Sequence, residues 1–223
     1  MLTKKNGQTV ISIPGALFLV GIISGTWAIL VVLTATLAYL PEHSDFSLFS
    51  TYLSDIGDTA GWPQIIFNSG TLIAAPMRYL VIVLIVLRLS QFGAGPAFAV
   101  SVLIIGFIST SGTVLMTATP LSVSASIHKL GIPLYFFGIV FLQTLIFIKE
   151  WSLKYVPKVL PGLSLLMVVV YFVFATLVIL NAQGVVSRGT PVIWEWLCFI
   201  TSVVWVFAQS ILLAKVEVTK AFT

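Results

Sequence analysis

Six long apolar segments dominate this chain of 223 residues. A transmembrane helix needs roughly 20 mainly apolar residues to cross a hydrocarbon layer of about 30 Å, and each segment satisfies that requirement. The segments run approximately over 13–40, 65–87, 96–118, 127–148, 159–180 and 192–214. Because they occupy most of the chain, they leave no room for a separate soluble domain. The sequence therefore predicts an all-α integral membrane protein, in which residues 1–223 form a single bundle of six transmembrane helices.

The composition excludes several classes of function. Hydrophobic residues make up 59% of the chain and charged residues 8%, whereas about a quarter of the residues in a typical globular protein are charged. The 11 Lys and Arg residues, set against 7 Asp and Glu, are too sparse for a nucleic-acid-binding surface. A single cysteine, Cys198, excludes an intramolecular disulfide and a cysteine-based metal cluster. No cofactor-binding or metal-binding motif is present, so the sequence implies neither a cofactor nor a metal.

The distribution of cations predicts the orientation of the bundle, because short cytoplasmic loops collect Lys and Arg. With the N-terminus inside, eight cations fall on inner segments, and two, Lys129 and Arg188, fall on outer segments. The inner cations are Lys4, Lys5, Arg88, Lys149, Lys154, Lys158, Lys215 and Lys220. Both termini are therefore expected to be cytoplasmic.

The longest connection, 41–63, is then an outer loop, and it shows helical periodicity. Phe49, Leu53 and Ile56 are spaced so that they share one face of a helix. This pattern predicts a short interfacial helix within 45–57, with its apolar side against lipid or the mouth of the bundle.

Small residues within the spans predict where helices approach one another closely. Gly21 and Gly25 form a small-xxx-small pair in the first span, and Gly131 lies in the fourth. Such residues let a neighbouring helix come near the backbone, so packing is their expected use.

Short motifs around the outer loop resemble a known family. A Leu-Ser-Asp-x-Gly motif ends at Gly57, an Ile-Phe-Asn-x-Gly motif ends at Gly70, and His128 opens the fourth span. In these motifs and in its number of spans the chain resembles the prokaryotic membrane family catalogued as domain of unknown function 998. That family is similar in layout to the eukaryotic group of DRAM, Frag and Sfk proteins. The resemblance implies a six-span bundle in a prokaryotic cell membrane and membrane lipids as partners, without a catalytic mechanism. The residues that match are Ser54, Asp55, Gly57, Asn68 and His128.

Ionisable residues near the outer surface form one candidate site. Asp55 and Asp58 of the first outer loop and His128 of another outer segment could converge to bind a divalent cation or to perform acid/base chemistry on a lipid headgroup. The alternative is that they are solvated, with Asp55 capping the turn at Gly57 and His128 lying at the headgroup level. No His pair or carboxylate-rich helix has the spacing of a metal site.

Arg78 is the formal charge that lies well inside a span, where an unpaired charge costs from about 2.5 kcal/mol upwards. We expect it to face the bundle. Its expected partners are Gln143, backbone carbonyls freed by Pro76, or a lipid phosphate reached from the inner leaflet, rather than a protein carboxylate. The alternative is that Arg78 extends along the hydrocarbon to the cytoplasmic headgroups.

These observations lead to two functional hypotheses. The first is a non-enzymatic membrane protein that binds lipid, a partner membrane protein or a second copy of itself through its helical bundle. The second is a lipid-headgroup-modifying enzyme or small transporter that uses the outer Asp and His residues together with Arg78. The first suits a chain without a catalytic or cofactor motif, so no residue is proposed as catalytic. The candidate residues for lipid or headgroup binding are Ser54, Asp55, Asp58, Asn68, Arg78, His128 and Gln143.

Overall fold

The structure, a computed structural model, describes residues 2–5, 8–120 and 123–217. In this part of the chain an N-terminal hairpin precedes seven α-helices, six of them long. The elements are β1 (Leu2–Lys5), β2 (Gln8–Ile11), α1 (Ile13–Tyr39), the 3-10 turn η1 (Leu40–Glu42), α2 (Leu53–Asp58), α3 (Trp62–Gln91), α4 (Pro96–Ala118), α5 (Ala125–Ser152), α6 (Val159–Ala182) and α7 (Gly189–Lys215).

The ends of the long helices follow from their sequences. At the start of α1, the Ser12 hydroxyl accepts a hydrogen bond from the Gly15 N–H at 3.2 Å, and Pro14 occupies the first turn. These are the residue types that begin helices, because the first turn has free N–H groups and proline lacks one. At the end of α3, Gly93 has a φ of +97°, a backbone conformation that favours glycine. The chain therefore turns sharply there and enters α4 at Pro96.

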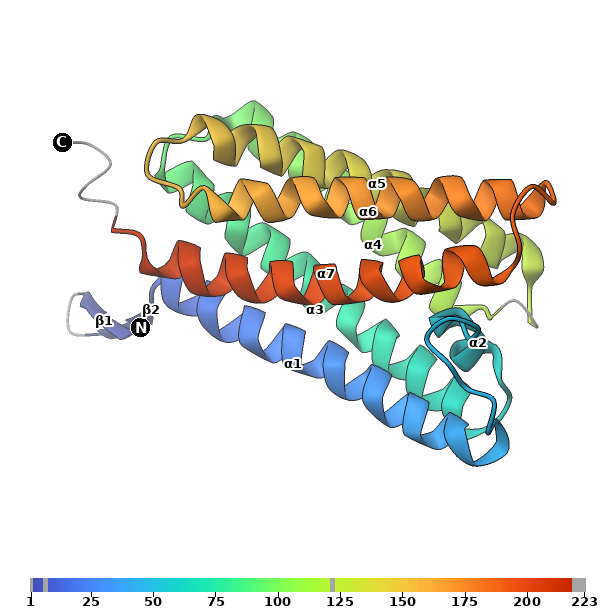
Figure 1. Ribbon diagram of the computed structural model, residues 1–223. Helices are drawn as coiled ribbons and strands as arrows, with labels where there is room; N and C mark the ends of the chain where they lie inside the picture. The colour runs from blue at the N-terminus through green and yellow to red at the C-terminus, as the bar shows by residue number, and fades with distance from the viewer. Residues whose placement is uncertain (1, 6–7, 121–122, 218–223) are drawn as a thin grey trace.

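The six long helices form a closed ring in sequence order. Each packs against the preceding and following long helix, and α7 returns to pack against α1. Consecutive long helices run in opposite directions, so α1 begins and α7 ends at the same end of the bundle (Figure 1). We call this the terminal end, and the opposite end, where α2 lies, the α2 end.

All six long helices are long and apolar enough to cross a membrane. Large apolar side chains on the outside of the ring are exposed, among them Leu33, Phe107, Phe141 and Phe172, each more than half exposed. A soluble monomer rarely exposes so much apolar surface, whereas hydrocarbon solvates it. The prediction of a multi-pass helical bundle is confirmed at this level. The antiparallel pairing of β1 and β2 was not predicted.

Two differences from the predicted elements affect the functional argument. Helix α5 continues to Ser152, four residues beyond its predicted end, and this extension carries Glu150 into the buried interior. The predicted interfacial helix over 45–57 was too long, because the structure is helical there only as α2, from Leu53 to Asp58. The segment before α2 forms turns through local hydrogen bonds, such as Thr51 N–H to the Ser47 carbonyl at 2.9 Å. It is also bound to α7, because Trp196 donates from Nε1 to the Thr51 carbonyl at 2.9 Å.

Glycines bring α7 close to α1 and α4 close to α5, as predicted. A Cβ atom at Gly21 would lie 1.6 Å from the Ser210 Oγ, and one at Gly131 would lie 2.7 Å from the Gly112 carbonyl oxygen. Neither distance leaves space for a side chain. The prediction that these glycines serve close packing is confirmed.

The interior of the ring is filled unevenly along its length. At the terminal half, Leu17, Ile85, Ile146, Leu160 and Leu213 come from five different helices, belong to one core cluster and are fully buried. Toward the α2 end, the ring encloses a cavity. The structure is therefore packed at one half and hollow at the other.

Candidate functional site

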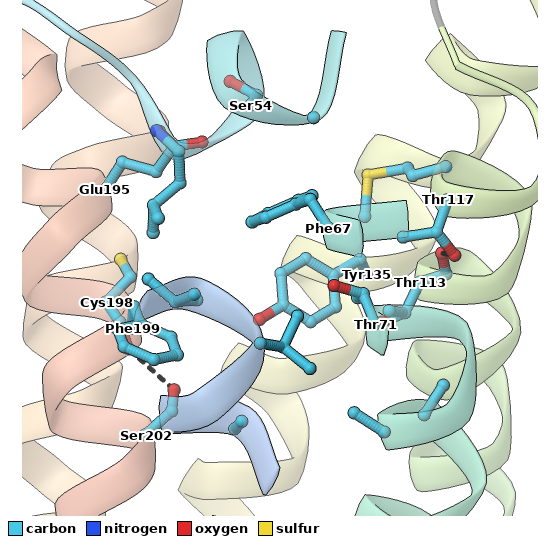
Figure 2. Close-up of a pocket in the computed structure, with 18 of the residues that line it drawn as sticks. Ser54, Phe67, Thr71, Thr113, Thr117, Tyr135, Glu195, Cys198, Phe199 and Ser202 are labelled. Atoms are coloured by element: carbon cyan, nitrogen blue, oxygen red, sulfur yellow. Dashed lines mark hydrogen bonds between the residues drawn. The ribbon is translucent and has the colours of Figure 1, made fainter. Parts of the chain in front are cut away.

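A cavity of about 430 Å³ lies inside the ring at the α2 end, and all seven α-helices contribute to its lining. Helix α2 lies over it as a roof, with Ser54 above the labelled side chains of the walls (Figure 2). Six of the candidate residues line the cavity, and Gln143 does not. The six are Ser54, Asp55, Asp58, Asn68, Arg78 and His128.

The cavity exists because small residues face it from two helices. Ser24, Gly25 and Ala28 of α1 and Ala74 and Ala75 of α3 are all part of its lining. Longer side chains at these positions would fill the space, as leucine and isoleucine do in the terminal half.

The cavity walls are amphipathic. Phe67, Phe136 and Phe174 provide apolar surface, whereas Thr71 and Thr117 provide hydroxyl groups. Figure 2 shows Phe67 below the roof and the two threonines on the α3 and α4 side of the cavity. A cavity of this kind suits a ligand with an apolar body and a small number of polar groups.

Arg78 is a cation that lines the cavity. Its Nη2 donates to the Thr113 Oγ1 at 2.9 Å, and the guanidinium carbon lies 5.1 Å from the centre of the Tyr135 ring. Its Nε is buried and has no hydrogen-bond partner among the described residues. Since a guanidinium carries five N–H donors, most of its capacity to bind an anion remains unused.

The predicted pairing of Arg78 with Gln143 is wrong. Gln143 is 1% exposed, and neither polar atom of its amide has a hydrogen-bond partner among the described residues. The two residues were matched by helical rise alone, which does not determine the face on which a side chain lies.

Arg78 shares its cavity with acidic residues of the α2 end. Arg78, Asp58 and Glu195 line the same cavity, because the small residues of α1 and α3 leave an opening inside the ring. The cavity that reaches Arg78 lies at the α2 end, whereas the sequence predicted access from the side of the chain termini.

A chain of hydroxyl groups orders the wall opposite α3. The Tyr171 hydroxyl lies 2.8 Å from that of Tyr135 and 2.7 Å from that of Ser202, and Ser202 donates to the Cys198 carbonyl at 2.7 Å. Because Ser202 uses its proton on the carbonyl, it accepts from Tyr171, which in turn accepts from Tyr135.

Hydrogen bonds and an ion pair connect helix α2 to residues at the start of α7. Arg188 donates from Nη2 to both carboxylate oxygens of Asp55, at 2.6 and 2.7 Å, and the Tyr52 hydroxyl donates to the Arg188 carbonyl at 2.9 Å. The Leu53 N–H donates to the Glu195 carboxylate at 2.6 Å. The hydrogen bonds to Asp55 raise the pKa of the Arg188 guanidinium, and burial raises the pKa of Tyr52.

Asp55 has two structural contacts besides lining the cavity. Its Oδ2 accepts the Tyr52 N–H at 2.9 Å, which caps the start of α2, and Arg188 neutralises its charge. On the other side of α2, Asn68 donates from Nδ2 to the Gly57 carbonyl at 2.8 Å. The alternative expectation that Asp55 has a capping role is therefore correct. The position differs, because Asp55 caps the start of α2 and not the turn at Gly57.

His128 is held at the edge of the cavity in one orientation. Its Nδ1 lies 3.1 Å from the Met116 carbonyl oxygen and 3.2 Å from that of Thr119. Both neighbours are acceptors, so Nδ1 carries a proton, and Nε2 is the acceptor in the neutral imidazole. This assignment follows from the hydrogen-bond geometry.

Sequence reasoning missed Tyr171 and Ser202 as parts of this site. Neither belongs to a motif, and Tyr171 lies in α6, a span that contains no charged residue. A usable signal was present for Tyr135, which follows His128 by seven residues and therefore shares its helix face. No comparable spacing links Tyr171 to residues of other helices.

Within residues 12–120 and 123–217, no group of three or more His, Cys, Asp and Glu side chains is arranged to hold a metal ion. In comparisons with known proteins, no family model, no curated protein and no solved structure matches the chain.

Proposed function

We propose that this chain is a multi-pass membrane protein that binds an amphipathic lipid in the cavity at the α2 end. An anionic part of the lipid headgroup, such as a phosphate, would bind to Arg78. The apolar part of the lipid would pack against the phenylalanine side chains. The observation that carries the proposal is the unused donor capacity of Arg78 inside an otherwise largely apolar enclosure.

The energetics of Arg78 support an anionic ligand. A guanidinium in a low-dielectric interior is costly unless its charge is compensated. The Thr113 hydroxyl and the Tyr135 ring compensate only part of that charge, because both are neutral. A phosphate could accept two parallel hydrogen bonds from the guanidinium and supply the missing charge.

We further propose that the terminal end is cytoplasmic and that the membrane is a prokaryotic cell membrane. The excess of cations on the segments at the terminal end supports this orientation. The motifs shared with the domain of unknown function 998 family support the choice of membrane and of lipid as ligand. In this orientation the cavity lies in the outer half of the membrane, so the ligand would enter from the outer leaflet.

A second candidate function is chemistry on the headgroup, and the orientation of His128 favours it. With the Nδ1 proton used by backbone carbonyls, Nε2 remains free to accept a proton in the neutral imidazole. Asp58 lines the same cavity. Turnover of a bound lipid that is lost in His128→Gln, with binding retained, would replace the binding function by this one.

Lipid binding by the purified protein tests the first proposal. We expect a phosphate-bearing lipid to bind to the protein in nanodiscs or detergent, as measured by native mass spectrometry. Removing a charge-assisted hydrogen bond costs about 1.5–3 kcal/mol, so Arg78→Gln should weaken binding by about tenfold or more. Lys149→Gln is the matched control, because Lys149 is a cation of α5 that does not line the cavity. Equal affinity in Arg78→Gln and Lys149→Gln would contradict the proposal.

A further inference from the structure

A second polar cluster lies in the filled, terminal half of the bundle, where α5, α6 and α7 meet. Its members are Glu150 of α5, Ser164 of α6, and Trp205 and Gln209 of α7, which are between 0% and 3% exposed. None of them lines the cavity of the proposed lipid site. A fully buried carboxyl group in a span needs a physical explanation, because ionisable groups at such positions are costly.

The hydrogen bonds of the cluster run in one direction toward the carboxyl group. Trp205 donates from Nε1 to the Ser164 Oγ at 2.9 Å, and Ser164 then donates to the Glu150 Oε2 at 3.2 Å. The Gln209 side chain lies beside the same carboxyl group. Among the described residues, neither the Glu150 Oε1 nor either polar atom of the Gln209 amide has a hydrogen-bond partner.

The elements around Glu150 supply no compensating cation. Helix α5 packs against α4 and α6, and neither of these helices contains a Lys, Arg, His, Asp or Glu residue. Lys149, its neighbour on α5, places its ammonium 5.7 Å from the centre of the Phe98 ring. In the following loop, Lys158 donates to the Trp151 and Leu153 carbonyls, and Lys154 lies over the Tyr155 ring.

On α3 and α7 the charged groups are also occupied or distant. Arg88 donates to the Gln91 side chain and to the carbonyls of Leu213 and Val216 at the end of α7. Lys215 is the last residue of α7, and Glu195 lies three to four turns away from Gln209, at the roof of the cavity. Within residues 12–120 and 123–217, Glu150 forms no salt bridge.

We propose that Glu150 is an intramembrane proton-binding site. Its ligand is a single proton on Oε1, which donates a hydrogen bond to the Gln209 Oε1. That one proton gives a partner to two buried oxygen atoms that otherwise have none, and it removes the uncompensated charge. The series then runs from Trp205 through Ser164 and Glu150 to the Gln209 Oε1, and each donor within it is directed to an acceptor; the Gln209 Nε2 lies outside the series.

The site continues the polar side of α7 that begins at the cavity. Ser202, Trp205 and Gln209 follow one another at intervals of three and four residues, so they lie on one face of the helix. The proton site is therefore in line with the hydroxyl chain of the cavity wall. The inference goes beyond lipid binding, and its test uses no lipid ligand.

Infrared spectroscopy of the full-length protein in nanodiscs tests the proposal directly. At pH 7, the difference between wild type and Glu150→Gln should contain the C=O band of a protonated carboxylic acid, and this band should shift in heavy water. The subtraction separates Glu150 from other carboxyl groups such as Glu195. Glu42→Gln, which changes an exposed carboxyl group, should leave the band unchanged. Carboxylate bands in the Glu150 difference spectrum would overturn the proposal.

The pH dependence of stability gives an independent readout. A folded protein that holds a proton given up by the unfolded chain loses stability as the pH rises. The melting temperature of wild type should therefore fall on alkalinisation more than that of Glu150→Gln, in which the amide can donate to Gln209 at any pH. Identical pH profiles for the two proteins would overturn the proposal.

A further variant covers the case in which Glu150→Gln does not fold. Ser164→Ala removes the hydroxyl that bonds to Oε2, the carbonyl oxygen of the protonated acid. The C=O band of Glu150 should then move to higher frequency, because a carbonyl that loses a hydrogen bond stiffens. An unchanged carboxyl spectrum in Ser164→Ala would also overturn the proposal.

Discussion

Arg78 places a charge inside the bundle that its protein contacts compensate only in part. It sits in a span, donates to Thr113, lies beside the Tyr135 ring and has a buried Nε with no hydrogen-bond partner among the described residues. Its partners hold the guanidinium in the cavity without neutralising it. In our account, an anionic ligand provides the remaining interaction.

Arg78→Lys separates charge from geometry. Lysine keeps the positive charge but cannot make two parallel hydrogen bonds to one phosphate. We expect Arg78→Lys to bind lipid more weakly than wild type and more tightly than Arg78→Leu, measured by lipid titration. Arg78→Leu should still insert and fold, because it removes a charge from a span. Full ligand binding by Arg78→Leu would show that Arg78 serves only to position the helix.

Tyr171→Phe tests the hydroxyl chain of the cavity wall. The change removes the acceptor of the Tyr135 hydroxyl and the donor to Ser202. Leaving a buried polar group unsatisfied costs about 1–3 kcal/mol, so the variant should unfold at a lower temperature than wild type. Tyr155→Phe, in the loop between α5 and α6, is the control and should be neutral. Equal melting temperatures for both variants would argue against an ordered chain.

At the residue scale, sequence reasoning could identify polar residues that stand out from an apolar background. Arg78 was found in this way, whereas Asn68 and His128 were found through the motifs that resemble a known family; all three line one cavity. Gln143 is also a polar residue in an apolar span, but its side chain does not line the cavity. Its orientation depends on how α5 is rotated about its axis in the ring. Glu150 was assigned to a loop, because hydropathy falls at Lys149 before the helix ends.

At the element scale, α2 acts as a short roof that is held by its neighbours. A helix of six residues is too short to be stable alone. Its contacts with α7 through Arg188, Glu195 and Trp196 and with α3 through Asn68 explain its position. Periodicity alone predicted a longer helix, because it does not take into account that the Ser50 and Thr51 carbonyls accept hydrogen bonds from Arg188 and Trp196.

Asp55 variants test the attachment of α2. Asp55→Asn retains an oxygen that can cap the Tyr52 N–H but loses the ion pair with Arg188, whereas Asp55→Ala loses both. Loss of a cap costs about 0.5–2 kcal/mol and an exposed ion pair about 0–1 kcal/mol. Limited proteolysis within 43–61 should therefore be much faster for Asp55→Ala than for Asp55→Asn. Equal protection of the two variants would exclude the capping role.

The Arg188 contact also has an expected pH response. Because the folded protein raises the pKa of Arg188, this guanidinium contributes its full stabilisation below its usual pKa and loses it only as the pH rises through the higher pKa of the folded protein. Deprotonation of Arg188 should therefore not loosen α2 between pH 6 and pH 9.

At the scale of the whole molecule, hydropathy and connection length account for the six-helix ring. The spans were recognisable by length, and short connections such as 92–95 force neighbouring helices to be antiparallel. The cavity could not be predicted in this way. It depends on small residues of α1 and α3 facing the same space, which requires the rotation of both helices to be known.

The proposed orientation of the molecule can be tested with single cysteines. Ser44 and Ser152 are exposed and lie at opposite ends of the bundle, so each can be changed to cysteine in a Cys198→Ala background. We expect an impermeant thiol reagent added to intact cells to label Ser44→Cys and not Ser152→Cys. Labelling of Ser152→Cys alone would reverse the orientation.

The most direct test of the central claim is an experimental structure of the protein purified with lipid from its own membrane. We predict continuous density inside the ring at the α2 end, with a headgroup within hydrogen-bond distance of the Arg78 guanidinium and an apolar chain against Phe67 or Phe136. A cavity closed by side chains, with Arg78 directed out of the ring into lipid, would contradict the account.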